Sequence, residues 1–204
     1  MQRFLKFSLA ALMPLTAAFA QAADTPFQIA TVSELNAGEA FVTFSNTGAS
    51  STVAFPTQNG NLCANIYVYT PGATQLSCCS CLVTPNSVVS APVKQALLSF
   101  TDDGRRSSLP ATSLAIKMLA STGVATCNAA TVGTGANVLA TGMVAWSTSL
   151  TIAATATPSY FPTRVPFTPG TLSAAELTRM TTICGFNQIT GGANVCKGCQ
   201  PGGH

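Results

Sequence analysis

The sequence predicts a mainly β protein: an antiparallel β-sandwich of immunoglobulin-like type, followed by one C-terminal helix and a cysteine-containing, glycine-rich tail. Short segments rich in β-branched and aromatic residues recur along the chain, separated by Asn-Gly and Pro-Gly turn signals. No helical segments alternate with them, which argues against a parallel sheet. Only 7% of the residues are charged, and the abundant threonine suits a pleated surface.

Seven to nine short strands are expected. The segments with strand character are residues 27–32, 40–44, 66–69, 75–83, 93–101, 114–119, 136–145 and 150–156. In one of them, Leu114, Ile116 and Met118 alternate with other residues, which predicts a strand with one face in the core and Lys117 pointing outward. Trp146, the only tryptophan, is expected to share that core.

The second half of the chain changes character after the expected β domain, which covers residues 23–157. Four prolines predict an extended connector at 158–171, and a helix with the cysteine tail follows at 172–204, packed on the β domain. Ser173 and Glu176 form a capping box, and Gly185 suits the C-terminal cap. One helix face carries apolar residues at helical spacing, namely Leu177, Met180 and Cys184.

Residues 1–22 are typical of a secretory signal peptide. Arg3 and Lys6 form a basic start, an apolar run follows, and small residues at 18–22 offer cleavage sites. The run is shorter than the about 20 residues that a membrane-spanning helix needs. We therefore expect a cleaved chain that is secreted, periplasmic or bound to the cell surface, with no transmembrane segment after cleavage.

The charge balance excludes one class of partner. The chain has nine basic and six acidic residues, and two of the basic residues lie in the signal segment, which leaves seven against six, a net charge of +1. Nucleic-acid binding needs clustered lysine and arginine that displace counterions from phosphates. Nucleic acid is therefore not an expected partner.

Eight cysteines dominate the chemistry of the chain. They are Cys63, Cys78, Cys79, Cys81, Cys127, Cys184, Cys196 and Cys199. An even number in an exported chain predicts four disulfides, although spacing alone leaves the connectivity open. Cys78 and Cys79 should point to opposite faces of a strand. Cys63 could reach the cluster at 78–81 across a turn, and Cys184 could close a small loop with Cys196 or Cys199.

A metal or redox site is the alternative use of these cysteines. Cys196 and Cys199 form a C-x-x-C motif, and thiolates suit zinc and copper(I). However, the sequence has no second clean C-x-x-C motif. This motif also follows the predicted helix, whereas a position at the start of a helix would lower the thiol pKa. We therefore favour structural disulfides and expect no metal and no cofactor.

No catalytic arrangement is visible. His204 is the only histidine and the last residue, and Asp102 and Asp103 belong to a solvated turn signal. A glycosidase would need two opposed carboxylates. The remaining candidates for such a pair are scattered along the sequence: Glu34, Glu39 and Glu176. We therefore expect a non-enzymatic protein.

The contexts of the cysteines resemble those of a known group. Residues 62–69 and 78–86, together with 177–186 and the C-x-x-C motif, resemble uncharacterised, exported, cysteine-rich proteins of soil bacteria. The resemblance implies export and shared disulfides but brings no activity. The expected function is that of a structural or interaction protein outside the cytoplasm, with a protein or glycan partner or with itself. A metal-binding or thiol-redox protein is the alternative, and a carbohydrate-active enzyme is a distant third.

Overall fold

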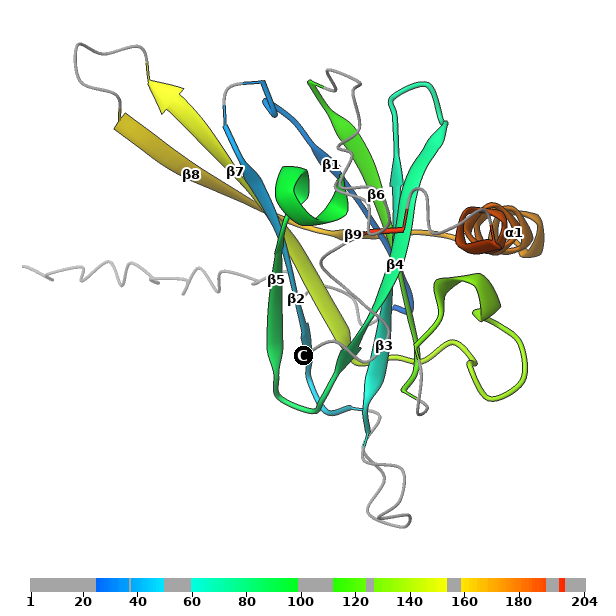
Figure 1. The fold of residues 1–204 in the computed structure, drawn as a ribbon. Coiled ribbons are helices and arrows are strands. Elements are labelled where there is room, and N and C mark those ends of the chain that lie inside the picture. The colour runs from blue at the N-terminus through cyan, green and yellow to red at the C-terminus, as the bar shows by residue number, and fades with distance from the viewer. Residues whose placement is uncertain are drawn as a thin grey trace, which may run out of the picture.

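The structure, a computed structural model, describes residues 25–36, 38–49, 60–98, 112–123, 127–153, 159–189 and 195–196. The elements in chain order are β1 (Phe27–Val32), β2 (Ala40–Asn46), β3 (Leu62–Tyr69), β4 (Gln75–Val83), β5 (Val88–Pro92), the π-helical turn η1 (Val93–Leu97), β6 (Leu114–Thr122), the 3-10 turn η2 (Ala129–Thr131), β7 (Met143–Ala153), β8 (Ser159–Pro166), β9 (Thr168–Pro169) and α1 (Ala174–Ile189). The prediction of a mainly β chain with one C-terminal helix is confirmed (Figure 1).

The strands form two antiparallel sheets whose inner faces share one core. Sheet A has the strand order β4-β3-β6-β1-β9, and sheet B has the order β5-β2-β7-β8. Buried residues of both sheets belong to the same cluster, for example Phe44 of β2 and Ile66 of β3. The predicted apolar face of Leu114, Ile116 and Met118 lies in this core, at 1% exposure or less. The arrangement is sandwich-like, while its assignment to the immunoglobulin-like type stays a prediction.

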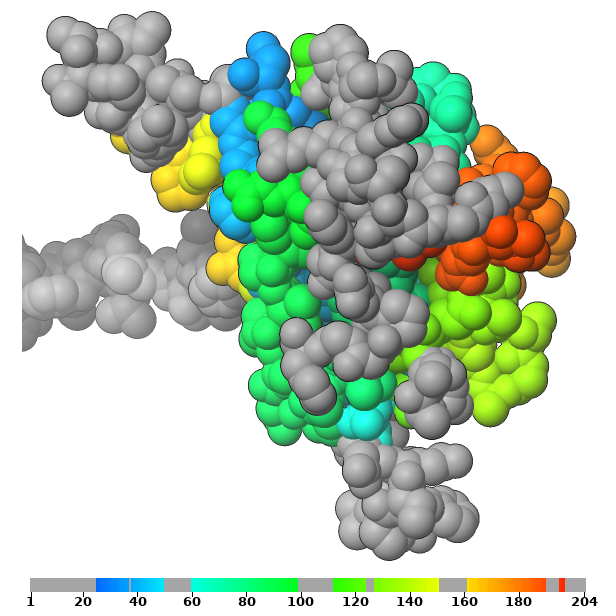
Figure 2. All heavy atoms as spheres, in the orientation of Figure 1, coloured from blue at the N-terminus to red at the C-terminus, as the bar shows by residue number. Residues whose placement is uncertain are grey.

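A third layer covers the outer face of sheet A. All eight residues of β3 are buried, because this strand has the core on one face and the helix side on the other. Tyr67 and Tyr69 pack with Met180 of α1 in a second apolar cluster. Figure 2 shows α1 and the segment around η2 lying against each other on the right flank, beside β4. The order of layers is therefore sheet B, sheet A, then α1 with η2 (Figure 1).

Two strand predictions are wrong. The segment 93–101 was expected to be a strand, but Val93–Leu97 forms η1 directly after β5, and residues 99–111 lie outside the described part. Segments 136–145 and 150–156 were expected to be two separate strands, but Met143–Ala153 is one continuous strand that pairs with β2 and β8. Gly142, at a φ of 105°, directly precedes that strand, and only glycine adopts this φ readily.

Residues 158–171 were expected to be an extended connector, but most of them form strands. These residues form β8, which pairs with β7 in the register Trp146↔Pro166 to Ala153↔Ser159, and the short β9. Prolines are tolerated because β8 is the last strand of sheet B in the described residues, so a proline nitrogen can face away from the ladder. A Pro-rich sequence can therefore be an edge strand.

The start of the helix follows the prediction, but its end does not. The Ser173 hydroxyl accepts the backbone N–H of Glu176 at 3.1 Å. The Glu176 side chain pairs with Lys117 instead of completing the capping box. Gly185 does not end the helix, which continues to Ile189. A Cβ at Gly185 would lie 3.6 Å from the Cβ of Ala130, so the glycine lies where α1 approaches η2. The expected signal segment 1–22 and the tail residues 190–194 and 197–204 lie outside the described part.

Candidate interaction surface

Disulfides join distant parts of the chain. The pairs among the described residues are Cys63–Cys127, Cys78–Cys184 and Cys79–Cys196. Cys81 is also disulfide-bonded, and Cys199 lies outside the described residues. These bonds indicate a protein of a non-cytoplasmic compartment, because thiols are kept reduced in most cytoplasms.

Both expected pairings are wrong. Cys63 bonds Cys127 next to η2 and not the cluster across the turn. Cys184 bonds Cys78 of β4, over a separation of 106 residues, and closes no small loop with the tail. The reason is the third layer: α1 and the η2 segment lie on sheet A, so their cysteines face strands and not each other.

The neighbouring Cys78 and Cys79 point to opposite faces of β4, as expected. Cys78 lies in the cluster under α1, whereas Cys79 lies in the core between the sheets. The Cys196 N–H also donates to the Cys78 carbonyl at 3.1 Å, so the segment 195–196 runs beside β4. Adjacent cysteines therefore fasten the helix on one face and the C-terminal segment on the other.

Thiol titration of the denatured protein tests the state of the cysteines. We expect no free thiols and no stoichiometric metal, and a peptide map that links Cys81 to Cys199 as the fourth pair. The reason is that seven of the eight cysteines are disulfide-bonded, and Cys81 is the one among them whose partner is not yet assigned, which leaves it for Cys199. Four free thiols with one bound zinc or copper ion would contradict this expectation.

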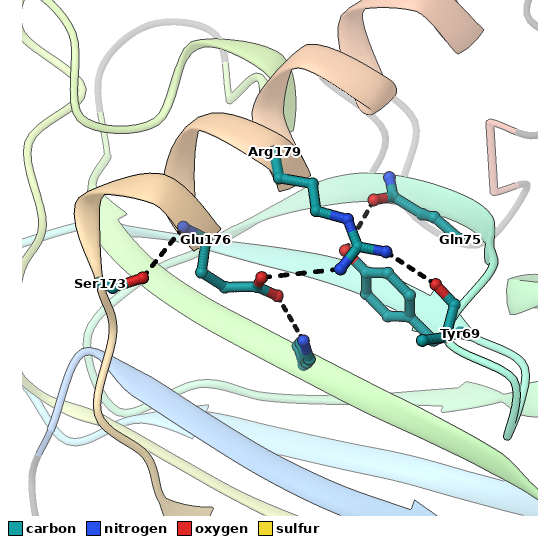
Figure 3. Close-up of polar contacts among 7 residues, drawn as sticks. Tyr69, Gln75, Ser173, Glu176 and Arg179 are labelled. Atoms are coloured by element: carbon teal, nitrogen blue, oxygen red, sulfur yellow. Dashed lines mark hydrogen bonds and ion pairs between the residues drawn. The ribbon is translucent and has the colours of Figure 1, made fainter.

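A group of polar side chains holds α1 on sheet A (Figure 3). Glu176 pairs with Lys117 of β6 and lies 3.8 Å from the Arg179 guanidinium. Arg179 also donates to the Ala73 carbonyl at 2.9 Å, and the Lys117 ammonium lies 4.7 Å from the centre of the Tyr69 ring. Lys117 thus points away from the core, as expected, but under a helix. Each charge in this group has a partner, so the group serves to dock the helix.

Tyr67 is buried beneath the third layer and donates to the Ala129 carbonyl at 2.6 Å. Burial raises the pKa of Tyr67 well above its ordinary value. Burial, and to a smaller extent the Glu176 carboxylate, raises the pKa of Tyr69 in the same direction. Both hydroxyls therefore stay protonated in the folded protein at pH values where an unfolded chain would ionise them.

This pKa shift predicts a loss of stability in alkali. Above about pH 10 the unfolded state releases tyrosine protons that the folded state keeps, so unfolding becomes more favourable as pH rises. We expect the free energy of unfolding, measured with urea, to fall between pH 9 and pH 11, and to fall less steeply in Tyr67→Phe. An identical pH dependence in that variant would contradict the assignment.

Two of the acidic candidates, Glu39 and Glu176, lie on different sheets of the sandwich. One Glu39 oxygen accepts the N–H groups of Ala40 at 3.0 Å and Lys94 at 2.9 Å, which fixes η1 beside β2 in sheet B. Glu176 lies on the outer face of sheet A. Glu34 lies in the β1–β2 connection, at a φ of 58°. His204, Asp102 and Asp103 lie outside the described residues. No group of three or more metal-ligating side chains occurs in the part of the chain that the structure describes.

Trp146 lies on the outer face of sheet B, so its predicted place in the core is wrong. Its neighbours Ala145 and Ser147 are buried at 1% and 2% exposure and point inward. Strand alternation then turns the indole outward, where it is half-buried. The guanidinium of Arg164, on β8, stacks over the indole ring at 4.0 Å from its centre.

Hydroxyl groups continue this surface across the sheet. Thr43 lies directly beside Trp146 in the register, and Ser90 lies beside Thr43 on the other side. Their side-chain oxygens are 3.0 Å apart in an exposed hydrogen bond. We call this surface the Trp146 face. Its members are Phe41, Thr43, Ser90, Trp146, Thr148 and Arg164.

A second open surface lies on the inner side of β8. The β7–β8 hairpin projects beyond sheet A at the upper left of Figure 1. Phe161 and Val165 are therefore 58% and 48% exposed, although they share the inward face with core residues. A hollow of about 370 Å³ adjoins Val165. Its lining residues are Ile29, Ala30, Thr31, Val165, Pro166, Thr168 and Pro169.

Comparison with protein-family models, with curated proteins and with solved structures finds no match to this chain. Among the described residues, no helix has the length and apolar character needed to cross a membrane. The sequence reasoning missed Arg164 and the hydroxyl pair. The alternation of small Ala145 and Ser147 with larger neighbours could have placed Trp146 outward, but the partner strands were not known.

Proposed function

We propose that this chain is an exported, non-enzymatic interaction protein of the cell surface or extracellular space, and that the Trp146 face is its contact surface. One observation carries the proposal: the two outer faces of the sandwich differ. The outer face of sheet A is covered by α1 and η2 and fastened by Cys63–Cys127 and Cys78–Cys184. The outer face of sheet B presents an aromatic–cation pair over which no described helix or strand packs.

The burial of the cysteines supports a structural role for them over a thiol-redox function. Exchange requires a thiolate to attack a disulfide sulfur directly, so its rate depends on access. Every disulfide-bonded cysteine in the described residues is at most 6% exposed. A metal site would need reduced thiolates, which cysteines held in disulfides do not supply.

Fractionation of the producing cells tests the proposed function. The wild-type protein is expected to sediment with the cell envelope or extracellular matrix. The double variant Trp146→Ala/Arg164→Gln should remain in the soluble exported fraction. Leu82→Ala, at an exposed position on sheet A, is the matched control and should behave as the wild type. A wild-type protein that is entirely free and indistinguishable from the double variant would overturn the proposal.

Export itself makes a separate prediction. The basic start, the apolar run and the small residues at 18–22 predict cleavage by a signal peptidase. The intact mass of protein from the periplasm or the culture fluid should correspond to a chain that begins near Gln21 or Ala23. An exported species that keeps Met1 would be the contrary result.

A further inference from the structure

The Arg164–Trp146 stack orients a cation for ligand binding. Arg164 is exposed, and it makes no ion pair within the described residues. The central carbon of its guanidinium lies 4.0 Å from the centre of the indole ring. A guanidinium carries five N–H donors in a fork that matches the two oxygens of a carboxylate. The stack therefore holds a positive charge of this kind in a defined place.

Hydroxyl side chains lie beside this stack, together with Phe41 and Pro166. The rows Ser90–Thr43–Trp146 and Phe41–Thr148–Arg164 run across sheet B in register. Four strands at about 4.8 Å spacing span about 14 Å, which is long enough for a short oligosaccharide. The hydroxyls can exchange hydrogen bonds with sugar hydroxyls, and the aromatic rings offer apolar surface to sugar C–H groups.

We infer that the Trp146 face binds an acidic polysaccharide, in which a uronate carboxylate pairs with Arg164 and a sugar ring packs beside the indole. This inference rests on the proposed function. Nucleic-acid binding draws its affinity mostly from clustered phosphate–cation contacts, whereas this face combines one cation with hydroxyl side chains and an indole, which suit sugar hydroxyls and sugar C–H groups. A protein partner that needs an apolar anchor would find it on the other side of the hairpin, at Phe161 and Val165.

Affinity electrophoresis of the purified, disulfide-intact mature protein tests the inference, with polygalacturonate in the gel as the probe. We expect retardation by polygalacturonate, weakened by salt, and none by its fully methyl-esterified, uncharged form. Arg164→Gln should weaken binding about tenfold or more, since a charge-assisted hydrogen bond is lost. Arg164→Lys should bind with intermediate affinity, because it keeps the charge but not the fork.

Trp146→Ala should also weaken binding about tenfold, since the apolar contact with the sugar ring is lost, and Leu82→Ala should leave binding unchanged. Near-ultraviolet circular dichroism establishes that each variant is folded. Equal binding of the charged and esterified polymers, no binding by the wild type, or full binding by the Trp146 and Arg164 variants would each overturn the inference. If the protein sediments with the cell envelope but does not bind polygalacturonate, the inference fails and the proposed function stands.

Discussion

Replacing Cys78 and Cys184 together by alanine is expected to lower the free energy of unfolding by about 3 kcal/mol. The neighbouring Cys79–Cys196 bond still joins the same two parts of the chain, so the bond that is lost closes a loop of roughly 15 residues through that neighbour. The loss of the bond also releases α1 from β4, which leaves the helix held by Met180, Leu177 and the polar group around Glu176. Urea denaturation of the double variant and the wild type measures the difference.

The matched control for this prediction is the pair Cys63→Ala/Cys127→Ala. That bond closes a loop of 64 residues that the other described disulfides do not shorten, so the same chain-entropy relation gives a somewhat larger loss of about 4 kcal/mol. Hydrogen exchange provides the second readout: α1 amides should lose protection more than β2 amides in the Cys78 variant. A loss below about 1 kcal/mol with unchanged helix protection would mean that the bond does not hold this layer.

Replacing Phe44 by alanine is expected to cost about 3–5 kcal/mol of stability. Phe44 is fully buried and lies between the two sheets, in contact with the shared core. Its removal loses the transfer free energy of the buried ring. It also leaves a cavity, which the close-packed neighbours fill only in part. The midpoint of urea denaturation and its slope give the value.

Phe41→Ala is the matched control, because the residue type and strand are the same. Phe41 lies three positions earlier on β2 and points to the outer face, where it is half-buried. We expect Phe41→Ala to lower the free energy of unfolding by less than half as much as Phe44→Ala. Trp146→Ala should have an effect similar to that of Phe41→Ala. Equal losses of stability at Phe41 and Phe44 would contradict the assignment of Phe41 to a half-buried outer face.

Local sequence located most of the β strands correctly. Residues 27–32 and 75–83 form strands with the expected bounds, because β-branched residues and turn signals act over a few positions. The start of the helix at Ser173 was also readable, since a capping hydroxyl acts on its own first turn. The pairing of the Pro-rich residues 159–166 with β7 is a contact between two strands, so the local sequence of either segment did not indicate it.

Composition and local patterns were enough to predict a mainly β chain with a C-terminal helix and disulfide-bonded cysteines. Which cysteines pair depends on the packing of the whole chain, because a bond needs two Cβ atoms brought within a few ångströms by elements far apart in the sequence. The tertiary structure also decided which strand faces are covered. Period-two alternation defines two faces of β7 but not which one meets the core, so Trp146 became surface only when β2 and β8 took their places beside it.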